Sequence, residues 1–224
     1  MKRTILRLFC TVLSCLLLLC ACEADESVIT QATELGAVPL DGLQLEAVVE
    51  ESAGFTYQYP TDDWFADDTI PVVSTYIVYK ETAGTEYPVN VNAQSAGHFA
   101  YPLTDTLCRE LSEQLVQTQA VKIESSDVYL LDGKPVIFIE SSFTFTNEVL
   151  DQLIDNGTYT EEFITASGGR EMFLALPTTR NYLLYAKAGD TLIAIGGAYY
   201  EEGQREPLLN CMKIMAQTVS LTQE

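Results

Sequence analysis

Alternating apolar and polar residues, the pattern of half-buried β-strands, recur along the first half of the chain. Residues 54–59 alternate aromatic and polar side chains and stop at Pro60, which predicts a strand that ends there. Residues 74–80 and 87–94 have related patterns, and we expect two further strands at these positions.

The clearest pattern is a pair of strands joined by a tight turn. Residues 121–131 and 134–145 flank Asp132-Gly133, a dipeptide typical of two-residue hairpins. Residues 136–139 are all apolar, so both faces of the second strand are apolar there. Such a strand needs cover on both sides, which predicts packed layers above and below the sheet.

A second hairpin is predicted near the end of the chain. Residues 182–188 and 191–199 read as strands, and a Gly-Asp dipeptide lies between them. Gly196 and Gly197 interrupt the second of these strands, and we interpret them as the site of a β-bulge.

Helical spacing of apolar residues marks the remaining elements. A Thr-Asp cap begins a helix over residues 105–119, and residues 148–156 form a second helix. Residues 158–167 predict a short helix capped by Thr158, and residues 203–217 predict a final helix. Hairpin-linked strands interrupted and followed by helices predict an α+β fold with an antiparallel sheet.

The first residues are not expected to belong to this fold. Residues 1–21 combine a basic start with an apolar run of about 15 residues, which is typical of a secretory signal and short for a membrane span. The run ends in Leu-Cys-Ala-Cys at Cys22, which resembles the lipobox of bacterial lipoproteins. That resemblance implies that Cys22 is acylated and holds the protein on the extracytoplasmic face of the cell membrane.

The next stretch is acidic. Residues 23–50 contain seven acidic residues but no basic or aromatic residue, so they bury little apolar surface. We therefore predict a flexible acidic tether over 22–46 and one folded domain over 47–224. Within that domain, the helical residues at about 147–168 are expected to form an insertion.

Charge limits the partners that this domain can have. The chain contains 12 basic and 32 acidic residues, a formal net charge of −20. Without the three cations of the signal the balance is −23, which repels nucleic acid and anionic lipid headgroups. A basic or neutral protein is a compatible partner, and the charge also serves solubility alone.

Two cysteines remain in the domain, Cys108 and Cys211. An even pair in an exported protein is compatible with a disulfide. Each also lies on the apolar face of a predicted helix, as buried free thiols do. The sequence leaves both alternatives open.

Residues for catalysis are scarce. His98 is the only histidine, so the sequence holds no His-pair metal motif, and no Gly-x-Ser-x-Gly elbow accompanies it. Adjacent acidic pairs, Glu161/Glu162 and Glu201/Glu202, point their members in different directions. We predict that the protein is not an enzyme and needs no cofactor.

One acidic loop is a candidate cation site. Asp62, Asp63, Asp67 and Asp68 surround Trp64, and flexible carboxylates are suitable Ca²⁺ ligands. Their spacing does not match an EF-hand, and such clusters are often only solvated. This loop carries the alternative function, a receptor for Ca²⁺ or a small ligand.

Several short motifs occur in an order that resembles the PsbP/DcrB superfamily. The motifs are Gly54-Phe55, Pro60, Trp64, Asp132-Gly133-Lys134-Pro135, and the final hairpin and helix. The resemblance covers most of residues 47–224, and it implies an antiparallel sheet between helical layers, an α/β/α arrangement. It also implies binding or assembly rather than catalysis, so we expect a non-catalytic module that binds a protein partner. The matching motifs are structural, and no functional residue is carried over from them.

Overall fold

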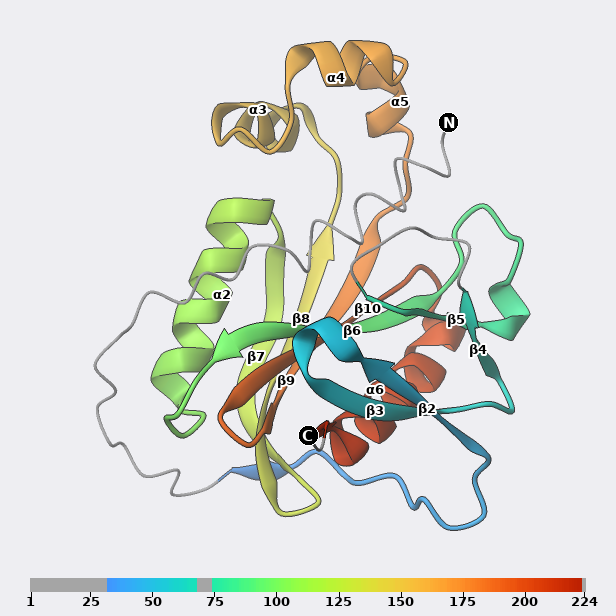
Figure 1. The fold of residues 1–224 in the computed structure, drawn as a ribbon. Helices are drawn as coiled ribbons and strands as arrows, with labels where there is room; N and C mark the ends of the chain where they lie inside the picture. The colour runs from blue at the N-terminus through green and yellow to red at the C-terminus, as the bar shows by residue number, and fades with distance from the viewer. Residues whose placement is uncertain (1–31, 68–73, 223–224) are drawn as a thin grey trace.

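The computed structural model describes residues 32–67 and 74–222, which form an α+β fold around a large sheet (Figure 1). The eight strands of this sheet lie in the order β1-β7-β8-β9-β10-β6-β5-β4, and all neighbours are antiparallel except β1 and β7. Their bounds are β1 (Thr33–Glu34), β4 (Trp64–Asp67), β5 (Tyr76–Tyr79), β6 (Asn90–His98), β7 (Lys122–Leu131), β8 (Lys134–Phe143), β9 (Thr179–Ala188) and β10 (Thr191–Tyr199).

A second, smaller sheet holds three strands in the order β11-β3-β2. Its members are β2 (Leu45–Glu50), β3 (Phe55–Pro60) and β11 (Ser220–Leu221). The strand predicted at residues 54–59 is therefore confirmed as β3, but it belongs to this small sheet. Pairing between β11 and β3 joins the two ends of the domain.

Helices cover both faces of the large sheet (Figure 1). They are α2 (Asp105–Gln119), α3 (Asn147–Asp155), α4 (Glu161–Ala166), α5 (Arg170–Leu174) and α6 (Arg205–Thr218), with short 3₁₀ turns at Glu51–Ala53, Lys80–Thr82 and Glu202–Gln204. Within the described ranges, no helix combines the length and apolar character needed to cross a membrane.

The predicted two-sided burial of the sheet is confirmed. Ile137 and Ile139 of β8 belong to one hydrophobic cluster, with α2 and the α3–α5 segment. Val136 and Phe138 belong to the other cluster, with α6 and the small sheet. The cover on this second side is thus partly a β-layer, which the expected α/β/α arrangement did not include.

Turn chemistry explains the β7–β8 hairpin. Leu131 pairs with Lys134, and both residues between them have positive φ, 52° at Asp132 and 70° at Gly133. Aspartate and glycine tolerate this left-handed conformation better than other residues do. The Asp-Gly signal therefore fixes the register of the central strands.

Helix α2 begins as predicted, because Thr104 Oγ1 accepts a hydrogen bond from the Leu107 N–H at 3.2 Å. The predicted cap of α4 is wrong: Thr160, not Thr158, accepts the N–H of Phe163 at 3.1 Å.

The helical insertion also extends to Leu174 rather than ending near residue 168. Gly168 and Gly169 have φ values of 111° and 83°, so the chain turns there and starts the additional helix α5.

An aromatic cluster holds the insertion on the end of the sheet. The ring centroids of Phe145 lie 4.6 Å from Phe143 and 5.2 Å from Phe173, both edge to face. Tyr159 and Phe163 extend the same cluster, with centroids 5.2 Å apart. Edge-to-face pairs of this kind add to the free energy gained by burying the rings.

The chain joins the domain earlier than the expected tether boundary at residue 46. Thr33 and Glu34 pair with Tyr129 and Leu130 of β7, and the backbone N–H of Val38 donates to Gln217 Oε1 at 3.0 Å. An edge strand has unpaired backbone groups that a nearby segment satisfies. The part of the tether from residue 33 onward is therefore packed on the domain, while residues 22–31 lie outside the described residues.

Gly196 and Gly197 do not form the predicted bulge. The register of β10 against β6 shifts instead between Leu192 and Ile193. A Cβ atom on Gly197 would lie 2.6 Å from Leu208 Cδ1 of α6 and 3.1 Å from a backbone oxygen. Glycine is needed here because helix α6 packs directly on the strand.

We therefore expect Gly197→Ala to lower the free energy of unfolding by about 1–3 kcal/mol, the usual cost of overpacking a core. Gly203→Ala is the matched control, because a Cβ there meets nothing within 4 Å. Urea titration measures both variants, and equal stability of the two would contradict this role for Gly197.

Candidate functional site

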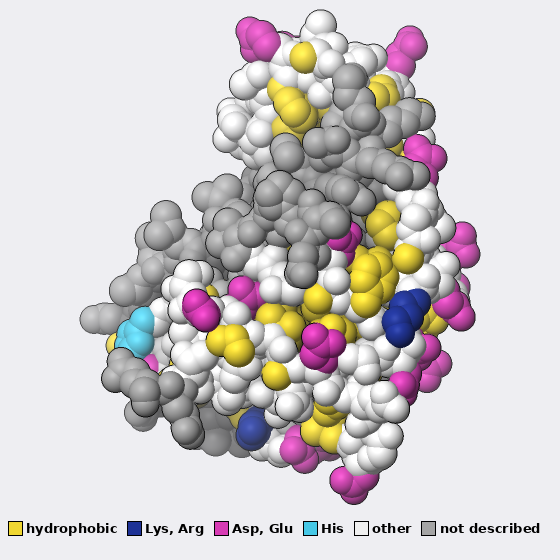
Figure 2. Space-filling view, turned by 45° about the vertical axis from the view of Figure 1, so that its right-hand side comes forward, with side chains coloured by type: hydrophobic (Ala, Val, Ile, Leu, Met, Phe, Trp, Pro, Cys, Tyr) yellow, Lys and Arg dark blue, Asp and Glu magenta, His cyan; other side chains and the backbone are white. Residues whose placement is uncertain are grey.

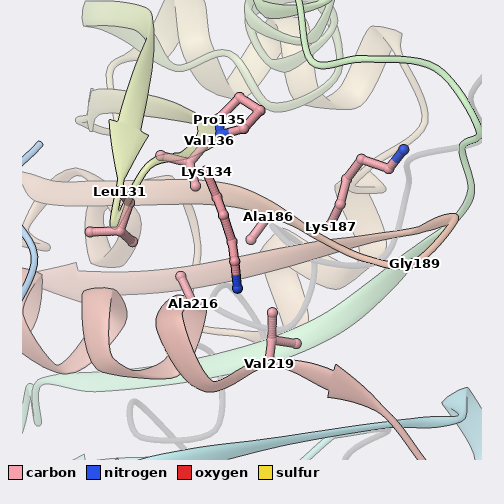
Figure 3. Close-up of a pocket in the computed structure, with 9 residues that line it drawn as sticks. All are labelled: Leu131, Lys134, Pro135, Val136, Ala186, Lys187, Gly189, Ala216 and Val219. Carbon is pink, nitrogen blue, oxygen red and sulfur yellow. The ribbon is translucent and has the colours of Figure 1, made fainter. Parts of the chain in front are cut away.

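A cavity of about 270 Å³ lies where the two hairpins approach the end of α6 (Figure 3). We call it the Lys134 cavity. Its apolar walls come from both hairpins and the C-terminal end of the helix: Leu131, Pro135, Val136, Ala186, Ala216 and Val219. The cavity is thus built by elements far apart in the sequence.

The polar groups of the Lys134 cavity are lysines. Lys134 projects toward Ala216 and Val219 (Figure 3), whereas the amino group of Lys187 points away. Lys187 Nζ donates to the carbonyl of Tyr101 at 3.1 Å. Among the residues that the structure describes, none that lines the cavity is acidic, although acidic residues greatly outnumber basic ones in the chain.

A second surface lies on the small sheet. Val49, Glu51, Thr56, Ser220, Leu221 and Thr222 line a shallow depression of about 620 Å³, which we call the small-sheet ledge. Val49 is 54% exposed and Leu221 is 46% exposed. Leu221 also packs near the β9–β10 turn, because a Cβ on Gly189 would lie 3.0 Å from Leu221 Cδ1.

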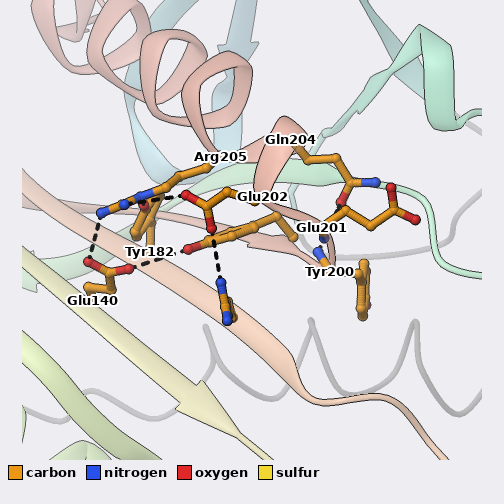
Figure 4. A network of polar contacts seen from close by, with 9 residues as sticks. Glu140, Tyr182, Tyr200, Glu201, Glu202, Gln204 and Arg205 are labelled. Atoms are coloured by element: carbon orange, nitrogen blue, oxygen red, sulfur yellow. Dashed lines mark hydrogen bonds and ion pairs between the residues drawn. The ribbon is translucent and has the colours of Figure 1, made fainter.

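A polar network ties the start of α6 to the large sheet (Figure 4). Arg205 donates to the hydroxyl of Tyr182 and lies 3.3 Å from Glu140 and 3.5 Å from Glu202. The hydroxyl of Tyr199 donates to the same Glu140 at 3.3 Å. Burial raises the pKa of Tyr182, and the hydrogen bond to Tyr182 raises the pKa of Arg205. Tyr182 and Arg205 therefore stay protonated, and the network stabilises the packing of α6 on the large sheet.

The acidic loop is only partly described. Asp62 and Asp63 lie in the turn between β3 and β4, Asp67 ends β4, and Asp68 lies outside the described residues. Lys80 Nζ donates to two backbone carbonyls of this turn, at 2.6 and 2.9 Å. Across residues 32–67 and 74–222, no three metal-ligating side chains gather.

The disulfide alternative is wrong. Cys108 and Cys211 are free, buried thiols. They belong to the two different hydrophobic clusters, on opposite faces of the large sheet. Desolvation raises the pKa of Cys108 to about 11 and also raises the pKa of Cys211. Both thiols are therefore protonated at neutral pH, and a protonated thiol is a poor nucleophile.

Other predicted residues lie apart from these surfaces. His98 is exposed and ends β6, paired with Thr191, rather than lying in a loop. Cys22 precedes the described residues. The sequence pattern marks Lys134 only as part of a turn motif and does not single out Val49 or Leu221. The signal available in the sequence was that Lys134 and Lys187 lie near the turns of two predicted hairpins in a strongly acidic chain.

No family model matches the chain, and no curated protein matches it. Among solved structures, the fold is similar to the Ran-binding protein Mog1p of Saccharomyces cerevisiae, with a TM-score of 0.44 and 9% identity over 81% of this chain and 97% of that one. It is also similar to LpqN of Mycobacterium tuberculosis, which is involved in cell envelope biogenesis. The TM-score is 0.44 and the identity 13%, over 82% of this chain and 93% of that one. The PsbP protein of the cyanobacterium Synechocystis matches with a TM-score of 0.40 and 10% identity, over 84% of this chain and 98% of that one.

We expect Arg205→Met to lower the free energy of unfolding by about 1–3 kcal/mol, because it removes a partner from the buried Tyr182 hydroxyl and from Glu140. Arg180→Met is the matched control, because Arg180 contacts Glu202 at 3.1 Å and lies 6.0 Å from the Tyr199 ring centroid, rather than donating to the Tyr182 hydroxyl. Such surface pairs contribute about 0–1 kcal/mol. Chemical unfolding measures both variants. Equal losses in the free energy of unfolding would contradict the stabilising role of Arg205.

Proposed function

We propose that this protein is a lipid-anchored, non-catalytic module on the extracytoplasmic face of the cell membrane, where it assembles with another protein. The observation that carries the proposal is the small-sheet ledge, where two large apolar side chains stay about half exposed. Single exposed apolar residues are common, but neighbouring ones that share one depression are typical of interaction surfaces.

The geometry of the ledge suits an extended partner segment. Val49 and Ser220 both pair with Thr56, so one row of residues crosses all three strands of the small sheet. Strand β2 is one of the two edge strands of that sheet. An edge strand presents backbone donors and acceptors to which another strand can add.

Charge supports a basic or neutral partner. Glu51 lines the ledge itself. On the face drawn in Figure 2, acidic side chains far outnumber basic ones. A basic segment would be attracted to such a surface, whereas nucleic acid would be repelled.

Anchoring rests on the N-terminal sequence. The basic start, the short apolar run and the Leu-Cys-Ala-Cys ending at Cys22 support export and acylation. Each buried methylene contributes about 0.8 kcal/mol, and stable anchoring takes more than one acyl chain. The order of sequence motifs supports membership of the PsbP/DcrB superfamily as part of this proposal.

The state of two cysteines and two tyrosines supports the non-catalytic assignment. Both described thiols are buried and protonated at neutral pH. Tyr185 and Tyr159 are buried as well, and desolvation raises the pKa of each. Groups held in this way contribute to packing rather than to nucleophilic catalysis.

We expect Val49→Glu and Leu221→Glu to reduce crosslinked capture of the dominant partner from native envelopes at least tenfold, because each places a charge in an apolar contact. Val116→Glu is the matched control, since Val116 is 41% exposed on the distant helix α2. Undiminished capture by the ledge variants would refute the assembly site. A partner lost only with a calcium chelator would favour the receptor alternative.

We expect Cys22→Ser to abolish incorporation of an alkyne-labelled palmitate and to release the protein from the membrane pellet. The physical reason is that the variant lacks the thiol that carries the acyl chain. A Cys20→Ser variant serves as the control and should retain the label. Labelled, membrane-bound Cys22→Ser protein would show that the anchor lies elsewhere.

A further inference from the structure

We propose that the Lys134 cavity binds a small monocarboxylate with a short apolar chain. This inference goes beyond the assembly function and does not depend on it, because the ligand would bind in the cavity rather than on the small-sheet ledge. It rests on the size of the cavity, its apolar walls and the charge of Lys134.

The volume limits the ligand to a small molecule. At about 270 Å³, the cavity lies below the range of roughly 300–1,000 Å³ that accommodates drug-sized ligands. Its walls are the aliphatic side chains of both hairpins and the end of α6. A compact hydrocarbon chain would remove these walls from water, which is favourable.

The charge in the cavity matches a single negative charge. Lys134 reaches across the apolar walls, while Lys187 is engaged by the Tyr101 carbonyl and lies 6.0 Å from the Phe99 ring. One ammonium group balances a carboxylate. A phosphate would need further donors, such as the two N–H groups of an arginine, and the described lining residues include no arginine.

Lys134 also differs from other basic residues in its ion pairing. Lys122, Arg170, Arg180 and Arg205 each lie within 4 Å of a glutamate or aspartate. In the described part of the chain, no such ion pair includes Lys134. Its charge is therefore available to an anion that enters the cavity.

The backbone fixes the position from which Lys134 projects. Gly133 takes the left-handed conformation of the tight turn, and Pro135 follows Lys134 directly. The proline ring locks its own φ, and it restricts the residue before it to extended conformations. The side chain thus starts from a constrained position, which lowers the entropy lost when a ligand binds.

The test measures 3-methylbutanoate binding to the full-length, lipidated protein in detergent micelles, by calorimetry and saturation-transfer NMR, with empty micelles as the blank. We expect saturable binding by this probe, at least tenfold weaker binding of acetate, and no binding of the neutral 3-methylbutanamide. Acetate lacks the apolar chain, and the amide lacks the charge.

Two variants locate the site. Lys134→Met should weaken 3-methylbutanoate binding at least tenfold, whereas Lys122→Met, which removes an exposed lysine of β7, should leave it unchanged. Ala216→Leu should also weaken binding, because it fills the cavity and keeps the charge. Unchanged binding by Lys134→Met, equal binding of acetate or of the amide, or no binding by the unaltered protein would each overturn the proposal.

The two proposals fail separately. Lys134→Met leaves Val49 and Leu221 in place, so partner capture by this variant should persist when carboxylate binding is lost. Val49→Glu likewise leaves Lys134 in place, so 3-methylbutanoate binding measured by calorimetry should persist in this variant when partner capture is lost. Each result therefore bears on one site only.

Discussion

The fold depends on one constraint, which is that the central strands of the large sheet bury side chains on both faces. β8, β9 and β10 contribute to both hydrophobic clusters, so each face requires its own cover. Helix α2 and the α3–α5 segment cover one face. Helix α6 and the small sheet cover the other, and the Arg205 network ties the start of α6 to the strands beneath it. Both candidate surfaces lie on or beside this second cover.

Local signals predicted the elements that local chemistry controls. The Asp132-Gly133 turn fixed a hairpin, Thr104 marked the start of a helix, and the apolar residues 136–139 predicted cover on two sides. Each of these depends on residues within a few positions of one another. The same is true of strand β3, whose alternating pattern ends at Pro60.

Features that depend on distant residues were not accessible in this way. The placing of β3 in a separate sheet depends on Ser220 and Leu221, and the need for Gly197 depends on Leu208. Opposite faces of the sheet separate Cys108 from Cys211, which no spacing reveals. For the same reason the Lys134 cavity and the small-sheet ledge were missed. The cavity combines residues 131–136 with residues 186–219, and the ledge combines residues 49–56 with residues 220–222.

Pairing of β1 with β7 has a consequence for any protein held at Cys22. An extended chain covers at most about 3.5 Å per residue, so residues 22–47 would allow a reach of nearly 90 Å. Because Thr33 is already fixed to the sheet, the free length ends there and the reach falls to about 40 Å. A domain anchored at Cys22, as proposed, would be confined to a thin layer above the lipid, with the β7 edge held toward it. A shorter tether raises the local concentration of membrane-bound partners around the binding sites of such a domain, compared with a longer tether.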